Sequence, residues 1–251
     1  MYFTDIHAHI IPAIDDGSKD INETIEMLSI AYNGGTRTIA ATPHMFLDLF
    51  GNNDLIAVQD RFDELTVALK AHRDQFNFLK DIKVSLGAEN YASPEFLEAL
   101  DQRRVLTLNA SRYLLIEFPP VLPFSQIQMV IQRIFLAGYT PIFAHAERCV
   151  AIQEEPVRMV NFWEQGCITQ VNSDSLLGGS SSRSSKCAEE LMTEGLVDVI
   201  ASDAHRVRWR PPDLGRIFRQ LQDHYTQEDV RAWMCSNANS ILIDQRLEGN
   251  A

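Results

Sequence analysis

The residues best suited to chemistry lie near the amino-terminus, where a short apolar run ends in a His-x-His pair. His7 and His9 are two positions apart, and in a β-strand residues i and i+2 point to the same face. Both imidazoles can therefore reach one ion, and neutral imidazole is a common ligand of zinc, iron and related metals. The turn Asp15-Asp16-Gly17 could bring a carboxylate back over the same place. Taken alone, the pair fits a polar loop as well as a metal site.

More side chains that can bind metals recur along the chain, each at or just after the end of a strand-like segment. They are His44, Glu89, Glu117, His145, Asp203 and His205, which with His7, His9 and Asp16 make five histidines and four carboxylates. A single histidine at such a place is usually an ordinary loop residue. Glu117 is harder to explain in that way, because a carboxylate inside the apolar run Leu-Leu-Ile-Glu-Phe must be paired or must coordinate a metal. The coincidence over six strand ends predicts a metal centre.

These positions depend on a regular alternation of strands and helices. The expected strands are 2–6, 36–42, 82–87, 112–118, 139–144, 167–172 and 197–201. The expected helices are 22–32, 54–76, 94–101, 125–137, 155–165, 184–194, 214–224 and 227–238. Such alternation is typical of parallel β/α units. Seven strands come close to a (β/α)8 barrel, in which the active site lies at the carboxyl ends of the strands. We therefore predict an α/β, TIM-like (β/α)7 barrel with its metal site there.

Length and composition limit the class of protein. A chain of 251 residues with 45% hydrophobic content suits one large α/β domain or two small ones. No change in composition and no repeat divides it, and the tract 178–185, rich in Gly and Ser, is too short for a domain linker and predicts a mobile loop. The formal net charge of −12 argues against a nucleic-acid partner, which normally selects a basic surface.

The same features predict a cytoplasmic location. We find no apolar run of the ~18 residues that a membrane helix needs, and no signal peptide at the start of the chain. The four cysteines are irregularly spaced and form no Cys-x-x-Cys motif, which is typical of reduced thiols in a cytosol.

Other catalytic classes lack their motifs. A cysteine-dependent phosphatase needs Cys-x5-Arg, but the residues six positions after the four cysteines are Glu155, Ser173, Thr193 and Ile241. The chain also has no Gly-x-Ser-x-Gly motif and no Walker loop. Catalysis by a nucleophilic thiol or by these two motifs is therefore not expected.

In its motifs and in their order along the sequence, the chain resembles the polymerase and histidinol phosphatase (PHP) superfamily. Within that superfamily it resembles the bacterial capsular-polysaccharide protein tyrosine phosphatases. The motifs run from Asp5 to His205: Asp-Ile-His-Ala-His-Ile-Ile-Pro-Ala-Ile-Asp-Asp-Gly, Thr-Pro-His, Gly-Ala-Glu, Leu-Ile-Glu-Phe, His-Ala-Glu-Arg, Gln-Val-Asn-Ser and Ser-Asp-Ala-His. The resemblance implies a distorted barrel of seven strands and a single PHP-type metallophosphatase domain over residues 1–251. Two positions depart from the family pattern: Ala13, where Gly is frequent, and Met45, where a second His is frequent.

The resemblance also implies three divalent metal ions, with manganese expected and iron or zinc as alternatives. His7, His9, Glu89 and Asp203 would hold the first ion; Glu89 would bridge to the second, held also by Glu117 and His145; Asp16, His44 and His205 would hold the third. Three such ions would change the formal charge from −12 to −6.

Hydrolysis of a phosphate monoester requires neutralised phosphoryl oxygens and a nucleophile, and clustered metals supply both by binding phosphate and acidifying a bridging water. A guanidinium adds bidentate contacts to the phosphate. Arg148, three residues after His145, is the first candidate, and Arg210 is the second. The alternatives are a salt bridge from Arg148 to Glu147 or Glu154, and an ordinary loop cation at Arg210. Asp203 completes the expected catalytic set.

Three functions remain open from the sequence. The first is a metal-dependent protein tyrosine phosphatase that acts on the tail of a bacterial tyrosine kinase and so regulates capsular or exopolysaccharide synthesis. The second is another metallohydrolase, such as histidinol phosphatase or an amidohydrolase, although amidohydrolases commonly use a carbamylated Lys where this chain has Glu117. The third is a non-catalytic metal-binding partner of an export complex, which would not need the complete ligand set. The oligomeric state is open.

Overall fold

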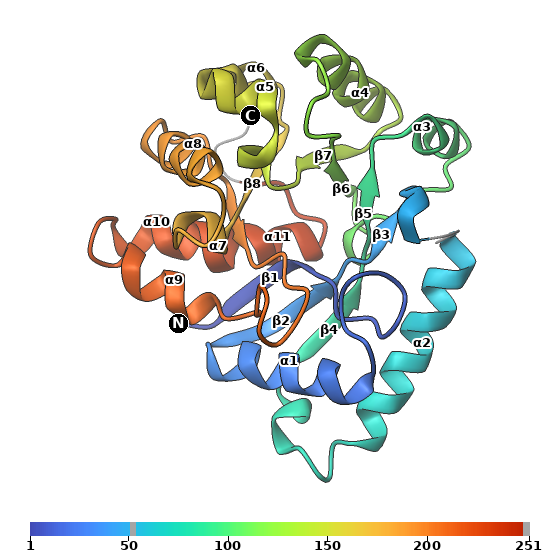
Figure 1. Cartoon of the computed structure of the whole chain (residues 1–251). Helices are drawn as coiled ribbons and strands as arrows, with labels where there is room; N and C mark the ends of the chain where they lie inside the picture. The colour runs from blue at the N-terminus through green and yellow to red at the C-terminus, as the bar shows by residue number, and fades with distance from the viewer. Residues whose placement is uncertain (51–53, 248–251) are drawn as a thin grey trace.

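A curled parallel sheet forms the centre of the computed structural model, which describes residues 1–50 and 54–247. One set of paired strands has the order β1-β2-β4, with β1 (Phe3–Ala8), β2 (Thr36–Ala41) and β4 (Lys83–Leu86). The other has the order β3 (His44–Met45), β5 (Glu89–Tyr91), β6 (Tyr113–Glu117), β7 (Thr140–Phe143), β8 (Ile168–Asn172) and β9 (Val199–Ala201). Figure 1 shows the strands inside a ring of helices.

Backbone hydrogen bonds connect the two sets. The chain passes from β2 to β3 and from β4 to β5 with only two residues between, and the Glu89 amide donates to the Pro43 carbonyl oxygen at 3.0 Å across that gap. At the other side, Ala8 pairs in parallel with Ala204, and the Asp203 amide donates to the His7 carbonyl oxygen at 2.9 Å. The ends of the first and last strands therefore lie side by side.

All seven expected strands are present, with ends within two residues of the prediction. β1 continues to Ala8, so His7 lies inside the strand rather than at its end. Two further strands, β3 and β5, were not expected, and they contain His44 and Glu89. Segments of two and three residues are too short to show the alternation that identifies a strand.

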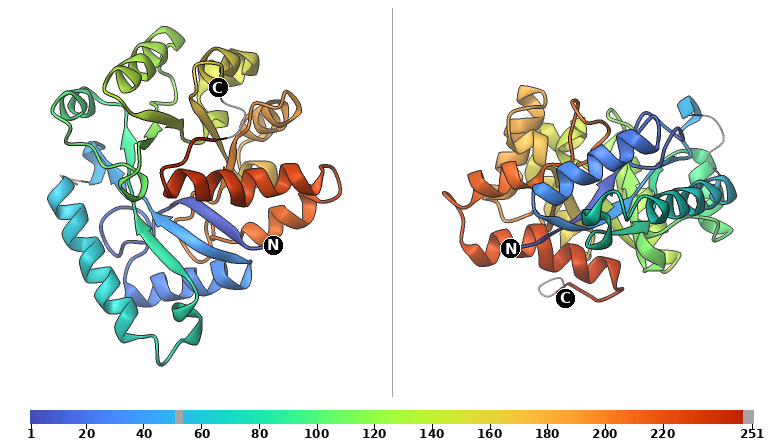
Figure 2. Two further views of the ribbon diagram at one scale, coloured as in Figure 1. Left: turned by 180° about the vertical axis from the view of Figure 1, so that it is seen from behind. Right: turned by 90° about the horizontal axis from the view of Figure 1, so that it is seen from below.

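Helices surround the sheet on its outer side (Figures 1 and 2). They include α1 (Ile21–Asn33), α2 (Leu55–Ala71), α3 (Pro94–Asp101), α4 (Phe124–Leu136), α8 (Ser182–Thr193) and α9 (Leu214–Leu221). Capping side chains explain where three of them start, because they accept hydrogen bonds from otherwise unpaired amides of the first turn. Asp20 caps α1 in this way, Ser93 caps α3 ahead of Pro94, and Ser181 caps α8.

Three expected helices differ in the structure. The helix expected at 54–76 ends at Ala71, and a 3₁₀ turn, η2 (Asn77–Lys80), follows after the extended residue Phe76. The segment expected at 155–165 as one helix is η5 (Pro156–Met159) followed by α6 (Val160–Trp163), and a short helix that was not expected, α5 (Val150–Glu154), precedes it. Pro156 explains the separation of α5 from η5, because the residue before a proline avoids helical backbone, and Glu155 has φ −154° and ψ 82°. The last helix runs past 238, as α10 (Gln227–Arg231), the π-helical turn η6 (Ala232–Ser236) and α11 (Asn237–Leu242).

The Gly- and Ser-rich tract 178–185 is only partly a loop. Ser181 accepts a hydrogen bond from the Ser184 amide and α8 begins at Ser182, so the second half of the tract is helical. The expectation of a loop over the whole tract was wrong, because serines that look like linker residues here act as a helix cap. A short helix before it, α7 (Ser173–Leu176), was also not expected.

Strand β6 shows how the core is divided. Leu114 and Ile116 pack with the buried side chains of the covering helices, whereas Leu115 belongs to an inner cluster that includes Ile241 of α11. α11 and the residues after it lie near the amino ends of the strands, where the Tyr113 hydroxyl donates to the Gln245 carbonyl oxygen at 2.7 Å. The carboxyl ends of the strands are left for the polar residues.

Two residues of α4 test this division of the core. Ile134 is fully buried and Leu136 is 87% exposed. We expect Ile134→Ala to lower the free energy of unfolding by about 2–4 kcal/mol through lost burial and the cavity left behind. Leu136→Ala on the same helix should change it by less than about 0.5 kcal/mol. Urea unfolding measures both, and equal effects would contradict the packing described.

Candidate metal centre

The structure brings the nine expected ligands together. A cavity of about 220 Å³ lies over them and is lined by Asp16, His44, Leu47, Leu49, Phe50, Glu89, Glu117, His145, Arg148, Asp203, His205 and Arg210. His7 and His9 are fully buried beneath it. Each ligand comes from the carboxyl end of a strand or from the loop that follows, so residues far apart in the sequence share one site.

Four side chains form the tightest group. The Nε2 atoms of His7 and His9 lie 3.3 Å apart. Glu89 Oε2 is 3.2 Å from the first and 3.3 Å from the second, and Asp203 Oδ1 is 3.3 and 3.4 Å from them. Ligands arranged tetrahedrally at ~2.0–2.1 Å around an ion are about 3.3–3.4 Å from one another. The donor set thus has the composition and spacing of a metal site.

Hydrogen bonds orient the imidazoles so that Nε2 faces this centre. His7 Nδ1 is 3.1 Å from Gln170 Oε1, and His9 Nδ1 is 2.8 Å from Asp15 Oδ2. Both oxygens are acceptors, so each Nδ1 carries the hydrogen and each Nε2 points at carboxylate oxygens. A proton or a metal ion is needed between these electron-rich atoms.

Glu89 joins this group to a second one. Its Oε1 lies 2.7 Å from His145 Nε2, and its Oε2 lies 3.1 Å from His44 Nδ1. Glu117 approaches both histidines, at 3.8 Å from His145 Nε2 and 3.6 Å from His44 Nδ1. His44, expected only in the third group, therefore also faces the carboxylate pair of the second.

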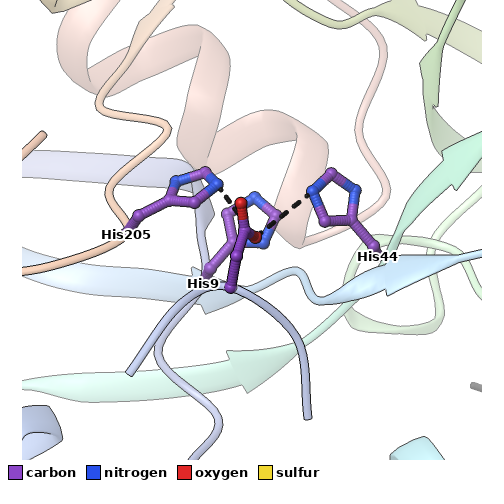
Figure 3. A group of neighbouring side chains, drawn as sticks. His9, His44 and His205 are labelled. Atoms are coloured by element: carbon purple, nitrogen blue, oxygen red, sulfur yellow. Dashed lines mark ion pairs between the residues drawn. The ribbon is translucent and has the colours of Figure 1, made fainter. Parts of the chain in front are cut away.

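Asp16, His44 and His205 form the third group. Asp16 Oδ1 lies 3.3 Å from His205 Nε2 and 3.6 Å from His44 Nε2. Figure 3 shows the imidazoles of His9, His44 and His205 converging from different parts of the fold. Burial lowers the pKa of His44 to about 4, so its imidazole is neutral at pH 7. Despite burial, contacts with His205 lower the pKa of Asp16 to about 2, so this group has a charged carboxylate ready for a cation.

Buried oxygen atoms without hydrogen-bond donors also indicate that these groups could hold metal ions. Among the described residues these include Asp16 Oδ1, Glu89 Oε2 and Glu117 Oε2, one in each group. A buried carboxylate oxygen left without a donor is costly. Three sets of described residues could each hold an ion: His7, His9, Glu89 and Asp203; His44, Glu89 and Glu117; and His9, Asp16, His44 and His205.

Asp203 connects the metal ligands to both arginines. While Oδ1 faces His7 and His9, Oδ2 accepts hydrogen bonds from Arg148 Nη1 at 2.8 Å, from Arg210 Nη1 at 2.5 Å and from Asn172 Nδ2 at 2.7 Å. Burial alone would raise the pKa of Asp203, but His7, His9 and the arginines hold it well below its usual range.

The arginine contacts differ from the alternatives considered from the sequence. Arg148 pairs with Asp203 and, at 3.6 Å, with Asp174, instead of with Glu147 or Glu154. Arg210 is no ordinary loop cation, because it contacts Asp203 and lies over the Trp209 ring at 4.2 Å. Both guanidinium groups line the cavity above the metal ligands.

The backbone is strained at three residues of the metal centre. His145, Asp203 and Arg210 have φ of 33°, 48° and 51°, in the left-handed region that side chains other than glycine rarely adopt. Such conformations cost roughly 1–3 kcal/mol each and persist where surrounding contacts define them, most often at functional sites. Ala13 is also left-handed, with φ 55°, a backbone conformation that glycine adopts without strain.

Several supporting contacts were not predicted from the sequence. Asp15 accepts hydrogen bonds from His9 Nδ1 and from the His44 amide, at 2.8 and 3.1 Å. Gln170 accepts from His7 Nδ1 and from the His145 amide, at 3.1 and 3.0 Å, and donates to Asn172 Oδ1 at 2.7 Å. A signal existed: Gln170 and Asn172 are polar residues at i and i+2 of an otherwise largely apolar strand.

Protonation competes with metal binding at this site. Burial lowers the pKa of His7, but Glu89 and Asp203 outweigh burial and raise it overall. The pKa of His9 is well above its usual value, because Asp15 and the other carboxylates outweigh burial. Burial and the neighbouring Glu89 raise the pKa of the Glu117 carboxyl from 4.5 to about 8. A metal ion entering the first two groups must therefore displace protons.

We expect metal uptake to release protons and to weaken in acid. Below pH 8 the Glu117 carboxyl of the metal-free protein is protonated, so apparent affinity should fall about tenfold per pH unit for each proton displaced. Manganese titrations by calorimetry at pH 6 and 8, in buffers of different ionisation enthalpy, measure this. Glu117→Gln is the matched variant and should release fewer protons. Uptake without proton release at pH 7 would contradict the expectation.

Sequence comparisons place the chain among known proteins. The family model "Capsular polysaccharide synthesis, CpsB/CapC" matches residues 3–243. Tyrosine-protein phosphatase CpsB of Streptococcus pneumoniae is 31% identical over 246 residues, which cover 96% of this chain and 98% of that protein. Tyrosine-protein phosphatase YwqE of Bacillus subtilis strain 168 is 35% identical over 249 residues, covering 97% of this chain and 92% of YwqE.

Solved structures agree with the sequence matches. A crystal structure from work on YwqE of Bacillus subtilis and CpsB of Streptococcus pneumoniae, described as unique metal-dependent tyrosine phosphatases, matches with a TM-score of 0.85 and 31% identity. The match covers 96% of this chain and 95% of that one. The phosphotriesterase from Mycobacterium tuberculosis, at 12% identity and a TM-score of 0.59, shares the fold alone and covers 98% and 95% of the two chains.

Proposed function

This chain belongs to the CpsB/CapC family of capsular polysaccharide synthesis, and on that premise we propose that it is a metal-dependent protein tyrosine phosphatase. The observation that carries the proposal is the group of His7, His9, Glu89 and Asp203, in which the two Nε2 atoms lie 3.2–3.4 Å from each other and from both carboxylates, under a cavity lined by two arginines. Metal ions bound there would neutralise phosphoryl oxygens and provide an activated water.

The chain's own residues divide the remaining work. Arg148 and Arg210 present guanidinium nitrogens to the cavity, where they would bind the non-bridging phosphoryl oxygens as charge develops. Asp203 holds both arginines through Oδ2 and presents Oδ1 to the metal group. Removing either arginine therefore disturbs substrate binding and one edge of the metal site together.

The apolar side of the cavity suits a phenyl ring. The cavity of about 220 Å³ over the metal ligands is also lined by Leu47, Leu49 and Phe50. The Phe50 ring stacks on the His44 ring, with the ring centroids 5.1 Å apart. An aromatic leaving group can bury its ring against these side chains while its phosphate faces the metals. Glu117 occupies the place where an amidohydrolase commonly has a carbamylated lysine, which argues against the amidohydrolase alternative.

We infer the finer features from the family pattern and the ligand groups. The fold is a distorted (β/α)7 barrel in one domain over residues 1–251, with the metals at the carboxyl ends of its strands. Three divalent ions bind, manganese first among the candidates. The substrate is the phosphorylated tyrosine tail of a bacterial tyrosine kinase of polysaccharide export, met in the cytoplasm. Among the described residues, no helix is long and apolar enough to cross a bilayer.

A comparison of substrates tests the proposal directly. Manganese-loaded protein should hydrolyse a phosphotyrosine peptide with much higher kcat/KM than histidinol phosphate, and a chelator should abolish the activity. Replacing all four cysteines should leave activity in place, because Cys149, Cys167 and Cys187 are buried thiols whose pKa values burial raises. Preference for histidinol phosphate would contradict the proposal.

Arg148→Ala tests the role of the guanidinium group. We expect kcat/KM on a phosphotyrosine peptide to fall about 30- to 1000-fold, equivalent to roughly 2–4 kcal/mol of barrier, with partial rescue by Arg148→Lys. Metal content must be measured in each variant, because Arg148 also contacts Asp203. Arg158→Ala, which breaks an exposed pair with Glu155, is the control and should leave turnover near normal. Retention of more than about a third of kcat/KM in Arg148→Ala would make Arg210 the leading candidate.

A further inference from the structure

A second cavity adjoins the metal site. It has a volume of about 480 Å³, and its lining includes Arg148 and Arg210, which also line the cavity over the metal ligands. Its other walls include Ser180, before α8, and Arg208 and Arg216, the last on α9. Figure 1 shows α9 next to α7 on this side of the molecule, and contacts between the two helices confirm that they adjoin.

This second cavity, which we call the arginine pocket, is strongly positive. Four guanidinium groups line it, those of Arg148, Arg208, Arg210 and Arg216, against the one carboxylate of Asp174. The whole chain has a formal net charge of −12, so such a concentration of cations is unusual on its surface. The pocket therefore has the opposite sign to the surface as a whole.

The charges in the arginine pocket are only partly compensated. Arg148 and Arg210 bind Asp203, and Asp174 contacts Arg148 at 3.6 Å while accepting a hydrogen bond from Ser180. Arg208 and Arg216 are exposed, and neither forms an ion pair with a residue in the described parts of the chain. Two guanidinium groups thus remain available for an anion from outside.

Trp209 lines the arginine pocket, in the loop that also carries Arg208 and Arg210. Its ring packs edge-on against His205, with centroids 5.2 Å apart, and Arg210 lies over it at 4.2 Å. The loop is fixed further by backbone hydrogen bonds from His205 N to Arg210 O and from Arg206 N to Trp209 O, both 3.1 Å. This wall of the arginine pocket is therefore held in place before a substrate arrives.

We propose that the arginine pocket binds a second anionic side chain of the substrate polypeptide, next in space to the phosphotyrosine in the metal site. The inference rests on the proposed phosphatase function and adds a determinant of substrate choice. The anion is the carboxylate of a nearby Asp or Glu, or the phosphate of a second phosphotyrosine. Arg208 and Arg216 bind this second anion, because Arg148 and Arg210 already bind the reacting phosphate and Asp203.

A peptide series on metal-loaded, full-length protein tests the pocket. The reference is a phosphotyrosine peptide with neutral flanks; one series moves a single Asp through the four positions on either side, and another peptide carries two phosphotyrosines. We expect at least one anionic peptide to exceed the reference in kcat/KM by about tenfold at low salt, and the preference to shrink in high salt as screening increases.

Substitutions in the arginine pocket test whether the pocket causes the preference for anionic peptides. Arg216→Ala and Arg208→Ala should each lower the ratio of kcat/KM between the anionic and the neutral peptide, and Arg216→Glu should favour a Lys-containing peptide. Arg216→Lys should keep part of the ratio, which separates charge from folding. Arg219→Ala is the matched control, an exposed arginine on the same helix outside the pocket, and should keep the ratio.

The outcomes separate this inference from the proposed function. If wild-type protein hydrolyses no phosphotyrosine peptide, the proposed function itself is wrong. If it hydrolyses all peptides with equal kcat/KM, or if the preference survives in Arg208→Ala and Arg216→Ala, the pocket assignment alone is overturned. Preference for the Asp series identifies a carboxylate as the anion, and preference for the doubly phosphorylated peptide alone identifies a phosphate.

Discussion

The rest of the structure depends on a few buried nitrogen and oxygen atoms that need a cation or protons between them. Glu89 Oε2 and Asp203 Oδ1 face the Nε2 atoms of His7 and His9 at 3.2–3.4 Å, out of contact with water. Such atoms repel one another unless a cation or protons lie between them. The hydrogen bonds of Asp15 and Gln170, the left-handed backbone at Asp203 and the parallel strand ends all serve to hold them in this arrangement.

Much of this could be predicted from the sequence, for identifiable reasons. Glu117 is a carboxylate inside an apolar run, which already indicated pairing or metal ligation, whereas the His-x-His pair alone fitted a polar loop as well and became informative only with the other strand ends. The strands were predictable because runs buried on both faces are long and apolar. Strands of two and three residues show no such pattern, so β3 and β5 were missed although they carry His44 and Glu89.

Other features required the tertiary structure. Asp203 was expected as a ligand, but nothing in its local sequence shows that one oxygen faces the metals while the other binds Arg148 and Arg210. The sharing of His44 between two groups, and the meeting of Arg208 with Arg148 in one pocket, depend on loops from different strands.

The pairing of Ala8 with Ala204 has a consequence for how the protein matures. His7 leaves the ribosome early in synthesis and Asp203 near the end, so the group that they share forms only when the last strand docks beside the first. The nascent chain has an incomplete set of ligands until then, and a truncated chain keeps it incomplete. Metal binding by this group would therefore require that nearly the whole polypeptide has been made and has folded.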